Sequence, residues 1–306
     1  MSIEILENNF WKLAVHPRLG ASPVALEAMA NGAWQAVMRP TNPELLGGES
    51  SAGFSSYNLA PYSNRIKNNK FVFEGREYKL QPNWADGILT IHGDIRNREL
   101  AMTRKENALE FCYDSRTVTD SNYPFSYTFK TRYALENEVF VSHLEVQNVG
   151  DVPMPAGLGY HPYFMSTFLG SSAAPKLQFQ AGSVYLTDTT RIPDGGSQAI
   201  PAELDFSSPK AATGFFIDNV YNDWDGVATL TWTGSGYGLR IEGDPIYKHF
   251  VVFNGDPDGT VALEPVSHCT DGFNLLARGV SNTGVRILAP GEVLAGSMRL
   301  KLEKYS

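Results

Sequence analysis

Four short polar stretches interrupt otherwise apolar or turn-like sequence, and each carries a side chain able to do chemistry. In chain order these side chains are Arg65, His92, His161 and Glu264. A carboxylate accepts protons and an imidazole, whose ordinary pKa is about 6.5, donates one near neutral pH, so the set suits general acid–base catalysis. Residues 157–164 surround His161 with glycines and aromatic rings. That composition suits a sugar, because its C–H face stacks on rings while its hydroxyls need polar partners.

Each of the four residues also has a purely structural interpretation. Arg65 precedes a hairpin and could be a solvated loop residue, and His92 at the end of a strand-like run could be structural. His161 could be a core histidine bonded to a carbonyl group. Glu264 ends an apolar run, where a buried, unpaired carboxylate would be costly, so it needs a partner or a function unless that strand end is wet. Considered singly, these residues leave both interpretations open.

Other chemistries find no support in the sequence. There is no Gly-x-Ser-x-Gly nucleophile motif, and the glycine-rich stretch 234–238 lacks the glycine order and the following helix of a dinucleotide site. No Cys-x-x-Cys or suitably spaced histidine pair indicates a metal site. The 2 cysteines, Cys112 and Cys269, do not form a disulfide framework. Cys112 lies in the alternating run 109–113 and is expected to be a buried structural thiol.

The elements that must position these residues follow a period of two, which is typical of half-buried β-strands. Residues 71–80 predict a hairpin with a glycine turn, whereas residues 23–36 are alanine-rich enough to form a turn or two of helix. No helices separate the strands as a parallel α/β fold requires. We therefore predict an all-β fold with one large antiparallel domain over residues 1–306. The other expected strands are 125–135, 138–147, 176–186, 228–233, 249–254 and 297–303.

Composition narrows the class of protein further. With 42% hydrophobic and 19% charged residues the chain can bury a large core, and 28 glycines with 18 prolines favour many turns over long helices. The net charge of −8 argues against nucleic-acid or polybasic membrane partners. The first 13 residues contain no apolar signal region and no apolar run is long enough to cross a bilayer, so a cytoplasmic location is expected.

Taken together and in order, the polar stretches resemble the aldose 1-epimerase (galactose mutarotase-like) family. The resemblance spans roughly residues 10–303 and implies a large antiparallel β-sandwich, of the galactose mutarotase-like supersandwich type, that needs no cofactor or metal. It also implies a small-molecule sugar partner and a monomer or homodimer. The segments that carry it are 61–66, 92–93, 159–164, 264–265, 271–274 and 284–292.

The resemblance implies roles for individual residues. Glu264 corresponds to the family's general base and His161 to its general acid, while Arg65 and His92 correspond to residues that hold the sugar. A family aspartate that binds hydroxyls matches Asp218 best, with Asp223 and Asp225 as close alternatives. Three more residues are predicted to bind substrate, and two further aromatic residues are possible sugar platforms: Asn64, Tyr163 and Arg96, then Trp84 and Phe273.

The choice of sugar stays open in the sequence. Tyr160 and Pro162 flank His161 where typical galactose mutarotases have an asparagine and a small hydroxyl residue, which is more like the broad bacterial branch of the family. We expect interconversion of the α and β anomers of a free aldose. The alternatives are a hexose-6-phosphate 1-epimerase and a catalytically silent carbohydrate-binding protein of the same fold. The phosphate alternative depends on Arg65, Lys67, Arg96 and Arg98, of which Arg96 and Arg98 could also be solvated loop residues.

Overall fold

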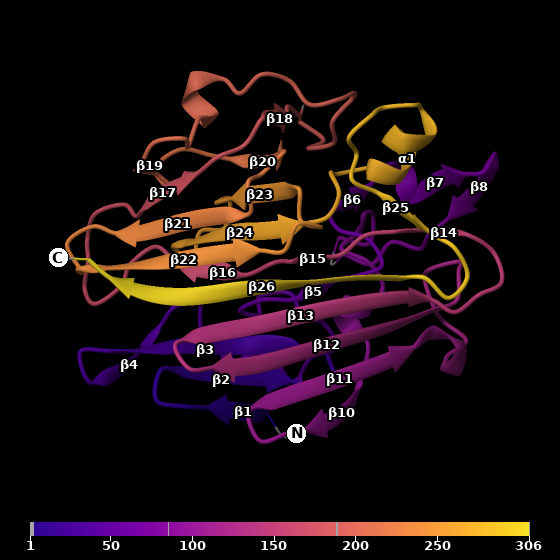
Figure 1. Ribbon diagram of the computed structural model, residues 1–306. Coiled ribbons are helices and arrows are strands. Elements are labelled where there is room, and N and C mark those ends of the chain that lie inside the picture. Colours follow the sequence, from indigo (N-terminus) through magenta and orange to yellow (C-terminus); the bar gives the residue numbers. More distant parts are fainter. Residues whose placement is uncertain (1–2, 85, 188, 306) are drawn as a thin grey trace.

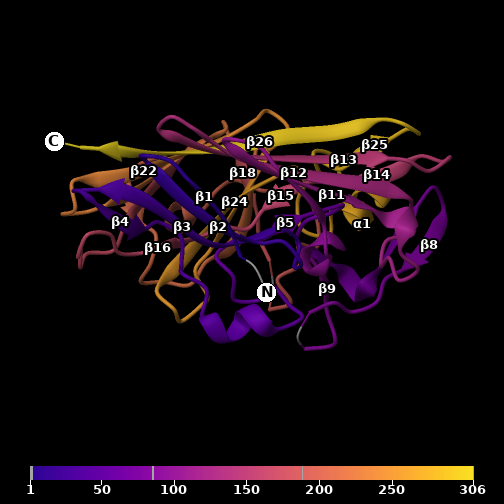
Figure 2. The same cartoon turned by 90° about the horizontal axis from the view of Figure 1, so that it is seen from below.

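The strands form a sandwich in which one broad sheet faces two others. The computed structural model describes residues 3–84, 86–187 and 189–305. The nine-stranded sheet crosses the front of the molecule, and the seven-stranded and four-stranded sheets lie behind it (Figures 1 and 2). The nine-stranded sheet contains, in spatial order, β10 (Ala101–Arg104), β11 (Ala108–Asp114), β12 (Tyr127–Glu136), β13 (Val139–Asn148), β26 (Val293–Lys304), β22 (Tyr237–Gly243), β21 (Val227–Trp232), β17 (Lys176–Phe179) and β19 (Lys210–Ala211).

The two sheets behind are smaller, and their strands also pair antiparallel. The seven-stranded sheet has the order β18 (Ser183–Tyr185), β20 (Asp218–Asn222), β23 (His249–Phe253), β24 (Thr260–Val266), β15 (Gly159–Tyr160) and β5 (Asn58–Leu59), with β16 (Tyr163–Met165) also paired to β24. The four-stranded sheet contains β1 (Glu4–Glu7), β2 (Trp11–His16), β3 (Ser22–Ala30) and β4 (Ala33–Ala36).

Short elements complete the described part of the chain. Three two-stranded pairs are β6 (Arg65–Ile66) with β9 (Thr90–Ile91), β7 (Lys70–Phe73) with β8 (Arg76–Lys79), and β14 (Met154–Ala156) with β25 (Arg286–Leu288). Helix α1 (Gly272–Ala277) lies beside β7 at one end of the sandwich (Figure 1). Single 3₁₀ turns occupy Pro43–Gly47, Lys67–Asn69, Ile95–Asn97, Ser115–Thr117 and Ala202–Leu204.

One hydrophobic core joins all three sheets. Leu144 of the nine-stranded sheet, Leu263 of the seven-stranded sheet and Leu26 of the four-stranded sheet belong to the same buried cluster. Side chains along β13 and β3 alternate between buried and partly exposed, as a sheet with one face on the core requires. The predicted all-β antiparallel sandwich is therefore confirmed. Over the residues described, no helix has the length and apolar character that crossing a bilayer requires.

Three local predictions from the sequence are wrong. Residues 23–36 form the β3–β4 hairpin, not a helix, because Asn31 and Gly32 both adopt positive φ and turn the chain back. The expected strand 176–186 is two strands, β17 and β18, which belong to different sheets. Cys112 is exposed, because its neighbours Leu109 and Phe111 face the core and the alternation turns residue 112 to solvent. The predicted hairpin at 71–80 is confirmed as β7–β8.

Candidate active site

The seven-stranded sheet brings two carboxylates onto one face. Glu264 on β24 lies opposite Val251 on β23, and Phe253, two residues further along, lies opposite Asp218 on β20. Residues directly opposite each other share a face of the sheet, and so do residues two apart on one strand. Glu264 and Asp218 therefore point to the same side. Every residue of β24 is buried, so Glu264 is a core carboxylate and does not end a wet strand.

A small antiparallel pair supplies the next two predicted residues. Arg65 on β6 pairs with Ile91 on β9, and His92 follows directly with a φ of 64°. Gly93 makes this turn possible, since a Cβ atom there would lie 2.0 Å from the carbonyl oxygen of Ala60. The turn directs His92 toward His161, and the two ring centroids are 4.9 Å apart.

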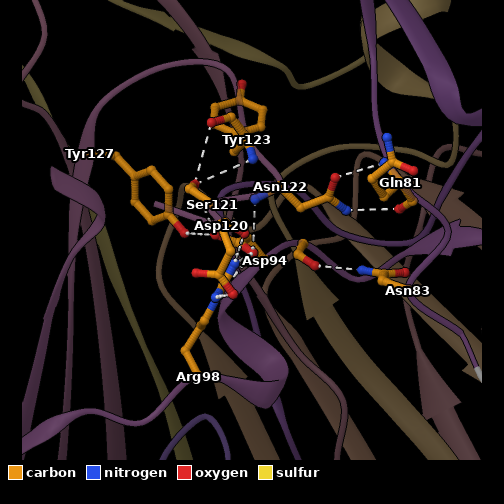
Figure 3. A network of polar contacts seen from close by, with 10 residues as sticks. Gln81, Asn83, Asp94, Arg98, Asp120, Ser121, Asn122, Tyr123 and Tyr127 are labelled. Atoms are coloured by element: carbon orange, nitrogen blue, oxygen red, sulfur yellow. Dashed lines mark hydrogen bonds and ion pairs between the residues drawn. The ribbon is translucent and has the colours of Figure 1, made fainter. Parts of the chain in front are cut away.

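A buried polar network supports the turn that carries His92. The Asp94 carboxylate, whose side chain is 4% exposed, accepts hydrogen bonds from the Arg98 guanidinium at 2.7 Å and the Tyr127 hydroxyl at 3.0 Å (Figure 3). Ser121 and the backbone of Asn122 donate to the same carboxylate. These hydrogen bonds connect the loop that precedes β12, which contains Ser121 and Asn122, to the turn that follows His92.

Changing Asp94 to asparagine should lower the free energy of unfolding by about 3 kcal/mol, because one acceptor oxygen in a buried network becomes a donor that faces other donors. Urea denaturation measures the change. Asp120→Asn is the matched control, because Asp120 also binds Arg98 but its side chain is 75% exposed. That variant should lose about 1 kcal/mol or less. Equal losses in the two variants would contradict the structural role of Asp94.

The predicted acid and base are in direct contact. His161, just after β15, places Nε2 3.2 Å from Oε1 of Glu264, and the two side chains are 6% and 3% exposed. Burial, reinforced by Asp218, raises the pKa of Glu264 well above its ordinary range. Burial, reinforced by Arg39, lowers the pKa of His161 well below its ordinary range. Low polarity disfavours the charged form of each group, so the pair holds one proton over a wide pH range, and in the free protein that proton lies on Glu264 beside a neutral His161.

Polar atoms of this pair remain available for a ligand. Oε2 of Glu264, Nδ1 of His161 and Nδ1 of His92 are buried and have no hydrogen-bond partner among the described residues. Buried polar atoms in folded proteins are normally bonded, so three unbonded atoms around one contact indicate a place where a polar ligand binds. The residues that line this cavity are Tyr57, Asn64, Arg65, Trp84, Leu89, Ile91, His92, His161, Tyr163, Asp218, Phe253, Asp256 and Glu264.

Two tyrosines and an arginine fix the imidazole of His161. The ring centroids of Tyr57 and Tyr163 lie 4.5 Å and 4.6 Å from that of His161, and the two tyrosine hydroxyls are 3.0 Å apart. The guanidinium carbon of Arg39 lies 3.6 Å from the centroid of Tyr163. Arg39 also forms ion pairs of 3.0 Å and 2.6 Å with Asp256 and Asp258, which connect the β23–β24 loop to this ring cluster.

Asp218 is the aspartate of its segment that reaches the cavity. Its Oδ2 lies 3.6 Å from Nη2 of Arg65 and accepts a 2.9 Å hydrogen bond from Nη1 of Arg191. The alternatives Asp223 and Asp225 do not line the cavity. Asp223 accepts a bond from the neighbouring Asn222, and Asp225 accepts one from the backbone of Val227. The geometry thus favours Asp218 among the three.

The interpretation of Arg96 and Arg98 as solvated loop residues is wrong. Arg96 is 2% exposed, and its guanidinium carbon lies 4.6 Å from the Trp84 ring and 5.6 Å from the Tyr57 ring. Arg96 thus packs against Trp84 and Tyr57, two residues that line the cavity, and does not itself line it. Arg98 is bound by Asp94 and Asp120, and Lys67 lies 3.3 Å from Asp194. The four cations proposed for a phosphate therefore do not converge on one open cluster.

Among the other predicted residues, Asn64, Tyr163 and Trp84 line the cavity and Phe273 does not. Phe273 is 2% exposed and packs against Tyr62 and Phe71 in the core. Sequence reasoning missed several residues that line the cavity or contact its lining, because no local pattern gave a signal for them: Arg39, Tyr57, Leu89, Ile91, Arg191, Phe253 and Asp256. Over the described ranges, no group of three or more histidine, cysteine, aspartate or glutamate side chains is arranged to hold a metal ion.

The chain is similar to known proteins over most of its length. Residues 32–301 match the family model described as aldose 1-epimerase. Uncharacterized protein YphB of Escherichia coli K12 is 29% identical over 283 residues, which cover 89% of this chain and 93% of that protein. The crystal structure of a putative aldose 1-epimerase from the same organism is 26% identical, with a TM-score of 0.83 over 99% of both chains. A galactose mutarotase-like protein from Clostridium acetobutylicum, 20% identical, has the same fold, with a TM-score of 0.85 over 99% of both chains.

Proposed function

The chain belongs to the aldose 1-epimerase family, and from this premise we propose that it interconverts the α and β anomers of a free aldose by acid–base ring opening and reclosure. The observation that carries the proposal is the buried contact of 3.2 Å between His161 and Glu264. Both side chains keep an unbonded polar atom there. A base and an acid must flank the anomeric centre of the sugar, and this pair supplies one of each.

The reaction needs only proton transfers and a bond rotation. The proton of the pair first passes from Glu264 to His161 across their 3.2 Å contact. Glu264 then takes the proton from the C1 hydroxyl while His161 delivers a proton to the ring oxygen, and the bond between C1 and the ring oxygen breaks. The open aldehyde rotates about the C1–C2 bond. In the reverse step His161 takes a proton from the C5 hydroxyl and Glu264 returns one to the C1 oxygen, which closes the ring as either anomer. The pair begins and ends with the same number of protons.

The charged and polar residues around the pair suit the rest of the sugar. We assign Arg65, Asp218 and Asn64 to the binding of hydroxyl groups, because they line the same cavity and a carboxylate, an amide and a guanidinium offer both acceptors and donors. His92 lies beside His161, where burial keeps its pKa well below the ordinary value and the ring neutral. Tyr163 and Trp84 offer apolar ring surface to the sugar.

The pH dependence of kcat/KM should be bell-shaped. Catalysis needs one proton on the Glu264–His161 pair. As pH falls through the lower ionisation, a second proton enters the pair and removes the base; as pH rises through the upper ionisation, the last proton leaves and removes the acid. The raised pKa of Glu264 and the lowered pKa of His161 should broaden the region of full activity between the two limbs. Measuring kcat/KM for anomer exchange from about pH 4 to about pH 10 tests this. A value of kcat/KM that falls at only one end of the pH range would contradict the prediction.

The sugar itself is best identified by exchange NMR spectroscopy across a panel of free and phosphorylated aldoses. Line broadening and exchange cross-peaks between the two anomeric protons report acceleration directly. We expect acceleration of at least one free aldose. If sugar 6-phosphates alone are accelerated, the protein is a hexose-6-phosphate 1-epimerase. Saturable sugar binding without any acceleration would instead identify a silent carbohydrate-binding protein and overturn the proposal.

A further inference from the structure

We propose that Asp271 is a positioning residue for the candidate active site, because it holds the short strand β6 so that the guanidinium of Arg65 lies in the cavity. Asp271 begins the segment 271–274, which the proposed mechanism does not use, and it does not itself line the cavity. The inference rests on the proposed function and adds to it a residue that acts through Arg65.

The carboxylate of Asp271 does not cap the helix that it precedes. An aspartate at the N-cap usually accepts a hydrogen bond from the backbone of the first helical turn, but Asp271, at the N-cap of α1, makes no such bond. Its Oδ1 accepts instead from the backbone N–H of Lys67 at 2.9 Å and from Nδ2 of Asn274 at 2.7 Å. Asp271 is completely buried, so both hydrogen bonds are shielded from water. The buried carboxylate therefore connects the start of α1 to the end of β6.

Asp271 binds β6 along one edge, and β9 binds it along the other. The backbone N–H of Asp271 donates to the carbonyl oxygen of Arg65 at 2.9 Å, and the carboxylate accepts from the N–H of Lys67. Consecutive carbonyl groups of a strand point to opposite edges. The carbonyl of Asn64 accepts from the N–H of His92, which follows β9. Both edges of β6 are therefore fixed, and Asp271 alone supplies two of the hydrogen bonds.

This backbone decides where the Arg65 side chain lies. Ile66 is 2% exposed and faces the core, so its neighbour Arg65 faces the opposite side, where it lines the cavity. Within the described residues the guanidinium makes two long contacts, a 3.3 Å hydrogen bond to Oδ1 of Asn64 and a 3.6 Å ion pair with Asp218. Because these contacts are long, the backbone of β6 is what fixes the direction of the side chain.

The turn after β6 also depends on the carboxylate. Asn68 and Asn69 have φ values of 56° and 54°, in the left-handed region that residues other than glycine rarely occupy. The N–H of Lys67 lies directly before this turn, and its hydrogen bond to Asp271 connects the turn to the start of α1. Loss of the carboxylate would release the end of β6 here, and the guanidinium of Arg65 would no longer be held in one place.

The test removes the carboxylate and asks whether the effect passes through Arg65. Asp271 has a φ of 56°, so Asp271→Gly keeps the backbone conformation without strain, whereas Asp271→Asn keeps an oxygen acceptor for the Lys67 N–H. The control is Asn274→Ala, because Asn274 binds Asp271 and the backbone of β7 but not β6. For each variant, exchange NMR gives kcat and KM with the free aldose that the wild type accelerates most.

Asp271→Gly should raise KM about five-fold and leave kcat within about two-fold, because Arg65 binds hydroxyl groups equally in the ground and transition states. Asp271→Asn and Asn274→Ala should keep the wild-type KM. In an Arg65→Ala background, Asp271→Gly should lower kcat/KM by less than about two-fold, since the side chain that Asp271 positions is already absent. An equal loss with and without the Arg65 side chain would overturn the positioning role, and so would a wild-type KM in Asp271→Gly.

A second variant removes the same hydrogen bond from its donor side. Lys67→Pro deletes the N–H that Asp271 accepts, and proline is tolerated at the first position of a helical turn, which Lys67 occupies. If Asp271→Gly does not fold, this variant decides the question: KM should rise by a similar factor, and an unchanged KM would overturn the proposal. If the wild type accelerates no aldose, the proposed function fails first and the inference fails with it.

Discussion

Replacing Glu264 by glutamine should reduce enzyme-accelerated anomer exchange by about 10²- to 10⁴-fold, which is the usual contribution of a positioned acid or base. Glutamine has the shape of glutamate but cannot take the proton from the C1 hydroxyl. The change should appear in kcat, because the base acts in the transition state and not in holding the sugar. Exchange NMR of the wild type and the variant at equal protein concentration measures it.

The fold should tolerate this substitution. Oε2 of Glu264 has no hydrogen-bond partner, and burial raises the pKa of this carboxyl group well above its ordinary range. Glutamine therefore replaces a neutral buried group by another of the same shape, without removing a bond to that oxygen. We expect a free energy of unfolding within about 1 kcal/mol of the wild type. Glu145→Gln on β13 is the matched control, since Glu145 is also a strand carboxylate but pairs with Lys130 in the nine-stranded sheet. It should leave the exchange rate unchanged; full activity in the Glu264→Gln variant would eliminate Glu264 as the base.

Replacing His161 by asparagine should reduce the rate of anomer exchange by a similar factor, about 10²- to 10⁴-fold. The ring oxygen then receives no proton when its bond to C1 breaks. Asparagine is smaller than histidine and leaves space beside Tyr57 and Tyr163, so a stability loss of about 1 kcal/mol is expected as well. His161→Gln fills more of that space and separates the two effects. It should recover stability and stay inactive.

The control for this position is His143→Asn. His143 lies on β13 and its Nδ1 is 2.9 Å from the Ser297 hydroxyl, so it is a partly buried histidine without a predicted chemical role. Its replacement should leave exchange unchanged. An active His161→Gln variant would mean that another group protonates the ring oxygen, and His92, whose ring lies 4.9 Å away, would be the next candidate.

The sequence contained enough information to predict the class of fold and the centre of the site. Period-two alternation survives in strands such as β13 and β26 because each has one face on the core. Polar residues that interrupt this alternation can be recognised in the sequence because they break the regular pattern. Glu264 could be singled out because a carboxylate in an apolar run is costly, and the structure places it 3.2 Å from His161.

Other features depend on contacts between distant parts of the chain. The alternation in 109–113 shows that Cys112 faces the opposite side of the strand from Phe111, but it does not show which of the two sides faces the core. The pairing of this strand with β12 in the nine-stranded sheet decides that Cys112 faces solvent. Arg96 is buried because Trp84 and Tyr57 cover it, and a charged residue in a loop gives no sign of that. Arg39 reaches Tyr163 and Asp256 only through the folded sandwich.

The central claim is that Glu264 and His161 together open the sugar ring. It is tested most directly by the first-order relaxation rate of a freshly dissolved pure anomer, compared among the wild type, Glu264→Gln, His161→Asn and the double variant. Residues that act as one unit show grossly non-additive effects. We predict that the wild type accelerates relaxation, and that each single variant loses nearly as much rate as the double variant, which should relax no faster than buffer. A double variant that still accelerates relaxation would contradict the account.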